Sequence, residues 1–165
     1  MSDKSLHAGD LLVVLFARSH PPDTFHWAIC VPITPKEALK FHAKETGGHW
    51  FFEDNPVPKH ALLSDATVSA SIKIGELKSI SSVNDLQSLF KSIPLAVPVV
   101  DAATEPVFRC RVWFKEAVRQ LHAHGYIQCL DVDDLEVECK SLARLNDPSQ
   151  PSYAGYKYYE SSKSH

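Results

Sequence analysis

The stretch that decides the fold is Phe25–Val31, which reads FHWAICV. Its aromatic and branched residues at positions 25, 27, 29 and 31 alternate with His26, Ala28 and Cys30. Successive side chains of a β-strand point to opposite faces, so this period of two predicts a strand with one apolar face that includes Trp27. His26 then shares the other face with Cys30.

Further strands are predicted on both sides of this one. The run Leu11–Ala17 is short, continuous and apolar, as expected of a buried strand. Three more extended segments are expected at 39–44, 49–52 and 66–77. Asp54 to Pro58, with its prolines, is expected to be a loop. The first half of the chain is therefore predicted to form a mostly antiparallel sheet.

The pattern changes to a helical period near Ser82. Apolar residues at helical spacing predict a short helix after Ser82 and a longer one from Cys110 to His124, which Gly125 ends. Acids in the first turn and basic residues near the end predict a further helix from Asp131 to Leu145. A late strand is expected at 156–159, followed by frayed terminal residues.

Together these elements predict one α+β domain over residues 1–165, with a core at roughly 10–147 and a tail at 148–165. The sheet is expected to pack against the helix that begins at Cys110.

Two histidines are predicted to meet on neighbouring strands. If the turn after Val31 centres on Thr34, His26 lies opposite His42. Directly opposed residues of an antiparallel pair have Cβ atoms about 4.5–5.5 Å apart, which lets one imidazole hydrogen-bond the other. A register shifted by an even number of residues would keep both rings on one face.

Cys110 is the candidate nucleophile because of its place at the start of a helix. Unpaired N–H groups and the positive end of the helix dipole lower the pKa of a thiol there, and the same N–H groups can hold an oxyanion. Arg109 and Arg111 flank it and favour thiolate. Cys129 and Cys139 lack that combination of features, as does Cys30.

At these residues the chain resembles the permuted papain-like thiol enzymes of the lecithin:retinol acyltransferase type, which are related to bacterial cell-wall cysteine peptidases. Their first box is a strand like HWAIYV, here His26–Val31, and their second is a polar residue on the next strand, here within Phe41–Ala43. The third is a helix-opening cysteine, here in Phe108–Phe114. The chain also resembles uncharacterised fungal proteins with this order of boxes.

The resemblance implies a permuted papain-like fold and a cysteine-dependent hydrolase or acyl transferase, such as a thiol protease, acting on an amide, ester or thioester bond. His26 would take the proton of Cys110, His42 would orient His26, and a thioester would form. The substrate would be a small molecule or a peptide. The Cys110 sulfur is expected within about 4 Å of a ring nitrogen of His26, beneath an open cleft.

Several alternatives stay open. His49, Glu45 or Asp54 could orient His26 instead of His42. Cys110 shares a helix face with residues such as Phe114, so it could be a small buried hydrophobic residue. The family's cysteine usually follows Asn, whereas Arg109 stands here, and a non-catalytic relative that binds a peptide or small molecule in the cleft is the second hypothesis.

Composition excludes several classes. The net charge of −3 and the lack of long blocks of one sign argue against nucleic-acid binding. No apolar run approaches the roughly 20 residues of a membrane helix, and no secretory signal is visible. Four scattered cysteines without a C-x-x-C pair predict free thiols in the cytoplasm, with no metal and no cofactor; His122 and His124 fit a helix end. The oligomeric state is left open.

Overall fold

The computed structural model describes residues 6–19 and 24–165. Its centre is a six-stranded sheet in the order β4-β3-β2-β1-β5-β6, in which every neighbouring pair is antiparallel except β5 and β6. The strands are β1 (Asp10–Arg18), β2 (Thr24–Pro32), β3 (Glu37–Thr46), β4 (His49–Pro58), β5 (Val68–Glu76) and β6 (Tyr158–Glu160). The predicted α+β class with a mostly antiparallel sheet is confirmed.

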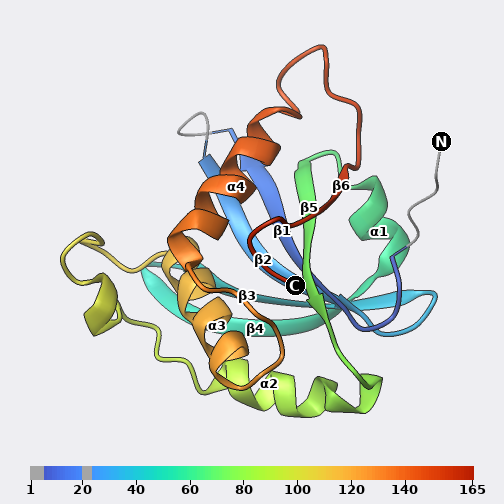
Figure 1. Cartoon of the computed structure of the whole chain (residues 1–165). Helices are drawn as coiled ribbons and strands as arrows, with labels where there is room; N and C mark the ends of the chain where they lie inside the picture. The colour runs from blue at the N-terminus through green and yellow to red at the C-terminus, as the bar shows by residue number, and fades with distance from the viewer. Residues whose placement is uncertain (1–5, 20–23) are drawn as a thin grey trace.

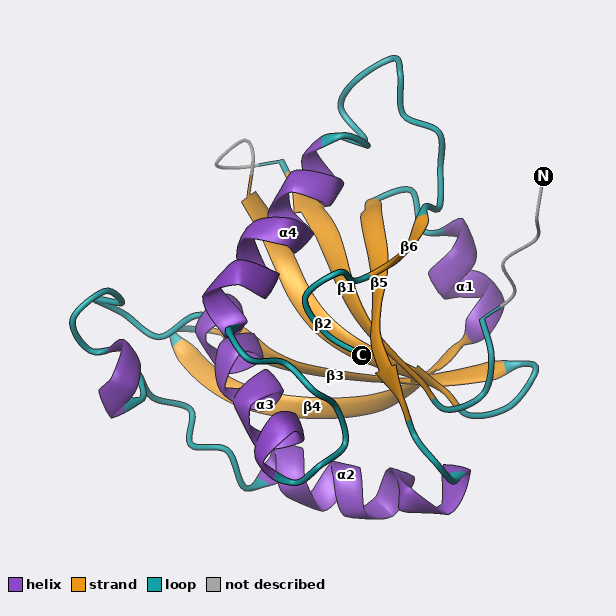
Figure 2. Cartoon of the chain, viewed as in Figure 1, coloured by secondary structure: helices purple, strands orange, loops and turns teal. Residues whose placement is uncertain are grey.

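The helices lie on both faces of the sheet (Figures 1 and 2). They are α1 (Lys59–Ser64), α2 (Val83–Lys91), α3 (Cys110–Ala123) and α4 (Val132–Arg144), with short 3-10 turns at Ile80–Ser82 and Val99–Asp101. Helix α3 packs on β2 and β3, and α4 packs on β5. Residues of α2, α3 and α4 share one apolar cluster, whereas Leu62 of α1 belongs to a second cluster on the other face.

Successive side chains of β2 point alternately into these two clusters. Trp27, Ile29 and Val31 belong to the cluster under α3, where the Trp27 and Phe114 ring centroids are 4.6 Å apart. Ala28 and Cys30 belong to the opposite cluster. Burying both faces of a central strand removes most of its apolar surface from water, which is the main force that holds the sheet between its helices.

Strands β2 and β3 form a fork. Their backbone ladder runs from Pro32–Ala38 to Ile29–Phe41. Beyond that point the first half of β2 pairs with β1, and the second half of β3 pairs with β4. Figure 2 shows the result, with β1 and β2 rising away from β3 and β4. The opening of the fork is the place where side chains rather than backbone groups can bridge the two strands.

Two predictions, of a loop at 54–58 and of frayed residues at the C-terminus, are wrong. Residues 54–58 are not a loop but the second half of β4, because β4 is an edge strand on which Pro56 and Pro58 need no ladder partner on the open side. The terminal residues are not frayed. Ser164 is buried and its hydroxyl donates to the Ile74 carbonyl at 2.6 Å, and the backbone of Ser164 bridges to Cys129.

Within the described part of the chain, no helix combines the length and the apolar character that crossing a bilayer requires.

Candidate functional site

The predicted contact between His26 and His42 is present. His26 Nε2 lies 2.7 Å from His42 Nδ1, and the two rings meet edge to face with centroids 4.8 Å apart. The hydrogen bond crosses the fork between β2 and β3, beyond the last backbone pair, Ile29–Phe41. A side-chain bond therefore links the two strands where the ladder has ended.

The register that was expected to produce this contact is wrong by two residues. The Ile33 amide donates to the Glu37 carbonyl at 2.9 Å, and the Thr34 hydroxyl accepts from the Lys36 and Glu37 amides. This turn centres on Pro35 rather than Thr34, so the ladder places Cys30 opposite Lys40. An even shift keeps side chains on the same face, which is why the two histidines still meet.

Glu53 is a third member of the group formed by His26 and His42, and its contact with His42 was not predicted from the sequence. It lies opposite His42 on β4, and its Oε2 is 3.1 Å from His42 Nε2. The signal was the pair Gly47-Gly48, whose positive φ angles form a two-residue hairpin turn that fixes the register of β3 and β4. Ending the strand at Phe52 left Glu53 without a predicted partner.

The three residues that could have oriented His26 in place of His42 have other described positions on β3 and β4. Glu45 accepts a hydrogen bond from the Gly48 amide at the hairpin turn, and His49 pairs with Thr46 at the end of the ladder. Asp54 lies opposite Phe41, one position out of phase with His42. Glu45 and His49 therefore lie at the hairpin turn, and Asp54 lies one position along the strand from the residue opposite His42.

Glu53 determines which nitrogen of each histidine carries a proton. A carboxylate only accepts, so His42 Nε2 is the protonated nitrogen and His42 Nδ1 is left as an acceptor. His26 Nε2–H then donates to His42 Nδ1. His26 Nδ1 is then the unprotonated nitrogen, which is the form that a general base needs.

Both imidazoles are neutral near pH 7. Burial, with the positive charges of neighbours such as His42 and Lys40, lowers the pKa of His26 to about 3. Burial and Lys40 also lower the pKa of His42 to about 4, although Glu53 opposes the shift. The desolvated fork therefore favours uncharged rings that can accept a proton.

Cys110 is the first residue of α3, as predicted, and Arg18 joins it to His26. Arg109, extended in backbone, precedes the helix, and no side chain caps its first N–H groups. Arg18 Nη2 lies 3.3 Å from Cys110 Sγ and 3.5 Å from His26 Nδ1. Because one nitrogen makes both contacts, the sulfur and His26 Nδ1 are at most 6.8 Å apart.

Arg18 changes two expectations about Cys110. The sulfur was expected to meet His26 directly, but its described hydrogen bond is to the guanidinium, and Cys110 is only 2% exposed within the cluster under α3. Arg111 was expected to favour the thiolate. It instead pairs with Glu105 at 2.6 Å and with Glu136 at 3.0 Å, so Arg18 is the cation at the sulfur.

The ion pairs of Arg111 belong to a network that holds the segment before Cys110. Lys115, 3% exposed, lies 3.0 Å from Asp101 Oδ1, and Arg119 pairs with the same carboxylate at 2.6 Å. Glu105 joins the network through Arg111. Buried charges are tolerated when they are paired and hydrogen-bonded, and here they anchor the loop 95–109 to α3. The position of Cys110 is thereby fixed.

The other three cysteines have less reactive surroundings. Burial raises the pKa of Cys30 to about 12, and it also raises the pKa of Cys129 and of Cys139. All four cysteines are free thiols. The contact with a guanidinium distinguishes Cys110 from the others.

A cavity of about 430 Å³ opens beside the two histidines. It is lined by His26, Lys40, His42, Lys44, Glu53, Asn55 and Val57. The cavity gives small molecules access to the imidazole pair from the β3 and β4 side.

The histidines at the end of α3 have structural contacts. His124 Nδ1 lies 2.9 Å from the Gln120 carbonyl, and His122 Nδ1 accepts from the Cys129 amide at 3.2 Å. Among residues 6–19 and 24–165, no group of three or more His, Cys, Asp or Glu side chains could hold a metal ion.

Comparison with known proteins gives a family but no activity. Residues 10–144 match the model of a family described as "Family of unknown function (DUF6914)". The chain belongs to this family. The match begins with β1 and ends with α4, so it includes His26, His42, Glu53 and Cys110. Neither the curated proteins nor the solved structures gave a match.

Proposed function

We propose that this member of the family is a cysteine-dependent hydrolase or acyl transferase with a permuted papain-like fold, acting on an amide, ester or thioester bond. The observation that carries the proposal is the series Glu53–His42–His26, whose last ring nitrogen, His26 Nδ1, contacts the same guanidinium as Cys110 Sγ. Strand histidine, neighbouring strand histidine and helix-opening cysteine also follow the order of that enzyme class. Four free thiols fit the reducing cytoplasm.

The chemistry begins with proton transfer from Cys110 to His26 Nδ1. Arg18 Nη2 contacts both atoms, so its guanidinium can stabilise the thiolate while the proton leaves. The imidazolium that forms gains from the thiolate on one side and, through His42, from the Glu53 carboxylate on the other. His42 and Glu53 are thus positioning residues, and Cys110 and His26 react.

Acyl transfer then proceeds in two balanced steps. The thiolate attacks the acyl carbon, a C–S bond forms, the bond to the leaving group breaks, and His26 returns its proton to that group. Water or an acceptor hydroxyl or amine next gives its proton to His26 and attacks the thioester carbon; the C–S bond breaks, and His26 returns the proton to the sulfur, which restores the thiol. The N–H groups in the first turn of α3 are placed to bind the oxyanion of each step.

The second candidate function is a non-catalytic binding protein, which the burial of Cys110 favours. In that case the thiol packs in the core, Arg18 is its permanent partner, and the cavity beside the histidines binds a ligand without turnover.

Acetylation by p-nitrophenyl acetate, a neutral activated ester, distinguishes the enzyme from the binding protein. The enzyme should release nitrophenolate in a burst of one equivalent per chain and carry an acetyl group on Cys110, detected by peptide mass spectrometry. His26→Ala should slow the burst by about 100-fold, the usual size of a lost general base. His124→Ala, at the exposed end of α3, is the matched control and should leave the burst unchanged. Acetylation of Cys110 that is no faster than that of Cys129, or indifferent to His26, would establish the binding protein.

A further inference from the structure

The cavity beside the two histidines has a wall to which the chemistry above gives no role. Lys40, Lys44, Asn55 and Val57 line it together with His26 and the other two members of the histidine group. Every one of these lining residues belongs to the described part of the chain. The volume of about 430 Å³ lies in the usual range of small-molecule sites. The polar groups of this wall therefore indicate which kind of molecule fits beside His26.

The charges around the cavity leave one positive charge in excess. Lys44 Nζ lies 3.6 Å from Glu53 Oε2, so these two charges compensate each other. The Lys40 ammonium lies 4.2 Å from the ring centroid of Phe16, and no carboxylate of a described residue is within ion-pair distance of it. Because both imidazoles are neutral near pH 7, Lys40 gives the cavity a net positive charge.

Asn55 places a neutral donor beside this charge. It lies directly opposite Lys40 on the β3–β4 ladder, where Cβ atoms are about 4.5–5.5 Å apart. Its side-chain amide donates one N–H to Glu53, and an amide has two, so the second can bond a ligand. An ammonium and an amide N–H at this spacing can bond the two oxygens of one carboxylate. A single excess charge matches a carboxylate better than a phosphate monoester, which carries about −1.5 to −2 at pH 7.

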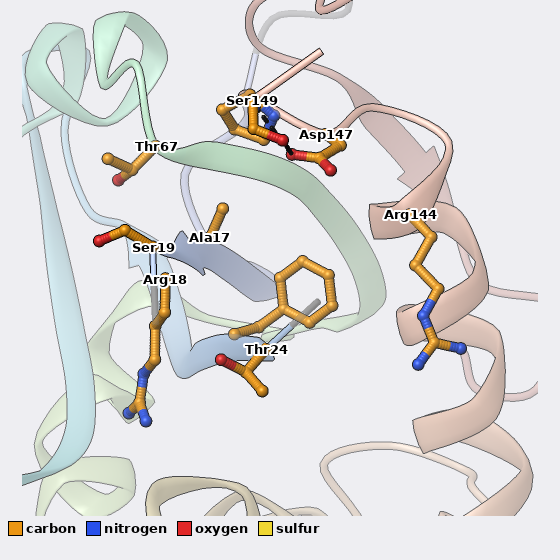
Figure 3. Close-up of a pocket in the computed structure, with 10 residues that line it drawn as sticks. Ala17, Arg18, Ser19, Thr24, Thr67, Arg144, Asp147 and Ser149 are labelled. Atoms are coloured by element: carbon orange, nitrogen blue, oxygen red, sulfur yellow. Dashed lines mark hydrogen bonds between the residues drawn. The ribbon is translucent and has the colours of Figure 1, made fainter. Parts of the chain in front are cut away.

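Arg18, the other cation near His26, is engaged on the side of the sulfur. Its Nη2 contacts both Cys110 Sγ and His26 Nδ1. Figure 3 shows its side chain extending from the end of β1 away from Asp147. The two cations therefore have separate places: Arg18 lies at the reacting sulfur, and Lys40 lies in the cavity that a substrate would enter.

The distance between Lys40 and His26 sets the length of the ligand. The ring centroids of Phe16 and His26 are 6.2 Å apart, and the Lys40 ammonium is 4.2 Å from the first, so it lies at most 10.4 Å from the second. A ligand that runs directly between the ammonium and the imidazole, with a hydrogen bond of about 2.8 Å at each end, needs a spacer of roughly three or four bonds. An amino acid has this length between its nitrogen and a carboxylate oxygen.

We propose that this cavity binds a carboxylate on the leaving group of the substrate, with Lys40 and Asn55 as its ligands; this rests on the proposed acyl-transfer function. His26 returns its proton to the leaving group, so the part of the substrate beside His26 is the leaving group. The substrate class is an acyl group joined through nitrogen, oxygen or sulfur to an amino, hydroxy or mercapto acid. The thiolate of Cys110 attacks the acyl carbon, the bond from that carbon to the nitrogen, oxygen or sulfur breaks, and the free acid leaves with the proton of His26.

Titration with N-acetylglycine, an unactivated amide, tests the carboxylate site by binding alone. The side-chain amide resonances of Asn55 are followed by NMR in the isotope-labelled protein. N-Acetylglycine should shift them in a saturable way, whereas the neutral N-acetylglycinamide should not. Lys40→Gln should weaken the binding by about ten-fold, the size of one charge-assisted hydrogen bond. Lys36→Gln removes the same charge from the exposed hairpin turn outside the cavity and should bind as the wild type does.

Acetyl transfer from S-acetylthioglycolate tests the same site in the reaction. This thioester and its neutral amide, S-acetylthioglycolamide, are compared by the rate at which each acetylates Cys110, measured by peptide mass spectrometry. The wild type should prefer the anionic thioester, although its carboxylate withdraws electrons less than the amide does. The preference should fall by about ten-fold in Lys40→Gln and stay in Lys36→Gln. A ratio of rates cancels the effect of Lys40 on the pKa of His26, because both thioesters use the same base.

Three results would overturn the carboxylate site. They are no saturable shift with N-acetylglycine in the wild type, equal affinity in Lys40→Gln and Lys36→Gln, and displacement of N-acetylglycine by inorganic phosphate at equal concentration. If the burst with p-nitrophenyl acetate is present in any of these cases, the enzyme stands and only this substrate class is wrong. Binding that depends on Lys40, without any burst, would support the carboxylate site and reject the enzyme.

Discussion

The two ends of β2 place a histidine and a cysteine on the same face of one strand and give them different environments. Cys30, near the end of the strand, has Leu12 on one side and Lys40 on the other in continuous ladders, and it is fully buried. His26, near the start, pairs with Phe16 on β1 and faces the fork on its other side. A step of four positions along one strand therefore leads from the candidate catalytic histidine to a closely packed cysteine.

The difference shows that burial alone does not make a side chain functional. Cys30 has apolar neighbours, and its pKa rises to about 12 because desolvation of the thiolate outweighs the opposing positive charge of Lys40. His26 is also desolvated, but His42 and Arg18 meet its two ring nitrogens. The end of a backbone ladder leaves room for such side-chain bonds, and the start of α3 lies against that opening.

The largest effect expected from this contrast is in thiol reactivity. At pH 6 a thiol with a pKa of about 12 is thiolate in roughly one molecule in a million, which is at least about 1,000-fold less than for an ordinary thiol with a pKa of about 8.5. Cys30 should therefore react with iodoacetamide at least about 1,000-fold more slowly than Cys110, whose sulfur contacts a guanidinium. Quantitative peptide mass spectrometry of the native protein measures both rates in one sample. Unfolding in guanidinium is the control and should bring the rates together; native rates within ten-fold of each other would contradict the contrast.

The next effect is on stability in acid, and of the two ends of β2 only the forked one contributes to it. The folded pKa values of His26 and His42, about 3 and about 4, lie below the unfolded value of about 6.5. The unfolded chain therefore binds more protons below pH 6.5, and the free energy of unfolding should fall as the pH falls. Two protons give a slope of at most about 2.7 kcal/mol per pH unit, reached between pH 6 and pH 4.

Urea unfolding at pH 7, 6, 5 and 4.5 measures this slope. The double variant His26→Gln with His42→Gln should be less dependent on pH over the same range, because its two amide side chains do not titrate. His124→Gln, which changes an exposed histidine at the end of α3, should keep the wild-type slope. An unchanged slope in the double variant would show that the two rings are protonated as easily in the folded protein as in the unfolded chain.

Some of this arrangement could be predicted from the sequence, and the reasons differ by residue. The meeting of His26 and His42 follows from parity, which survives the two-residue error in the turn. Cys110 at the start of α3 follows from helical spacing. Glu53 was predictable only if β4 continued past Phe52, and Pro56 and Pro58 argued against that until β4 was known to be an edge strand.

Arg18 was not predictable from local patterns. Its contact with Cys110 joins residues 92 positions apart, and it depends on how β1 ends relative to α3. A strand-ending arginine usually extends into water. Only tertiary packing shows that this one reaches a sulfur, and the same holds for the burial of Ser164 against β5.

The smallest expected effect is that of removing the negative charge of Glu53 while keeping a hydrogen-bond acceptor at its position. Glu53→Gln keeps an acceptor oxygen for His42 but removes the negative charge, and the amide can also present N–H and reverse both tautomers. Hydrogen bonds to charged groups are stronger than neutral ones by roughly 1 to 1.5 kcal/mol, so the acetylation burst should slow by about ten-fold.

Cys30→Ala is the matched variant at the packed end of β2. It removes one buried sulfur from the cluster beside α1, so it should lower the free energy of unfolding by about 1 kcal/mol while leaving the acetylation rate unchanged. Glu53 is partly exposed, with 21% of its side chain accessible, so Glu53→Gln should show the opposite pattern, a slower burst with little change in stability. If Glu53→Gln acetylates at the wild-type rate, the carboxylate does not act through His42, and His26 alone must provide the base.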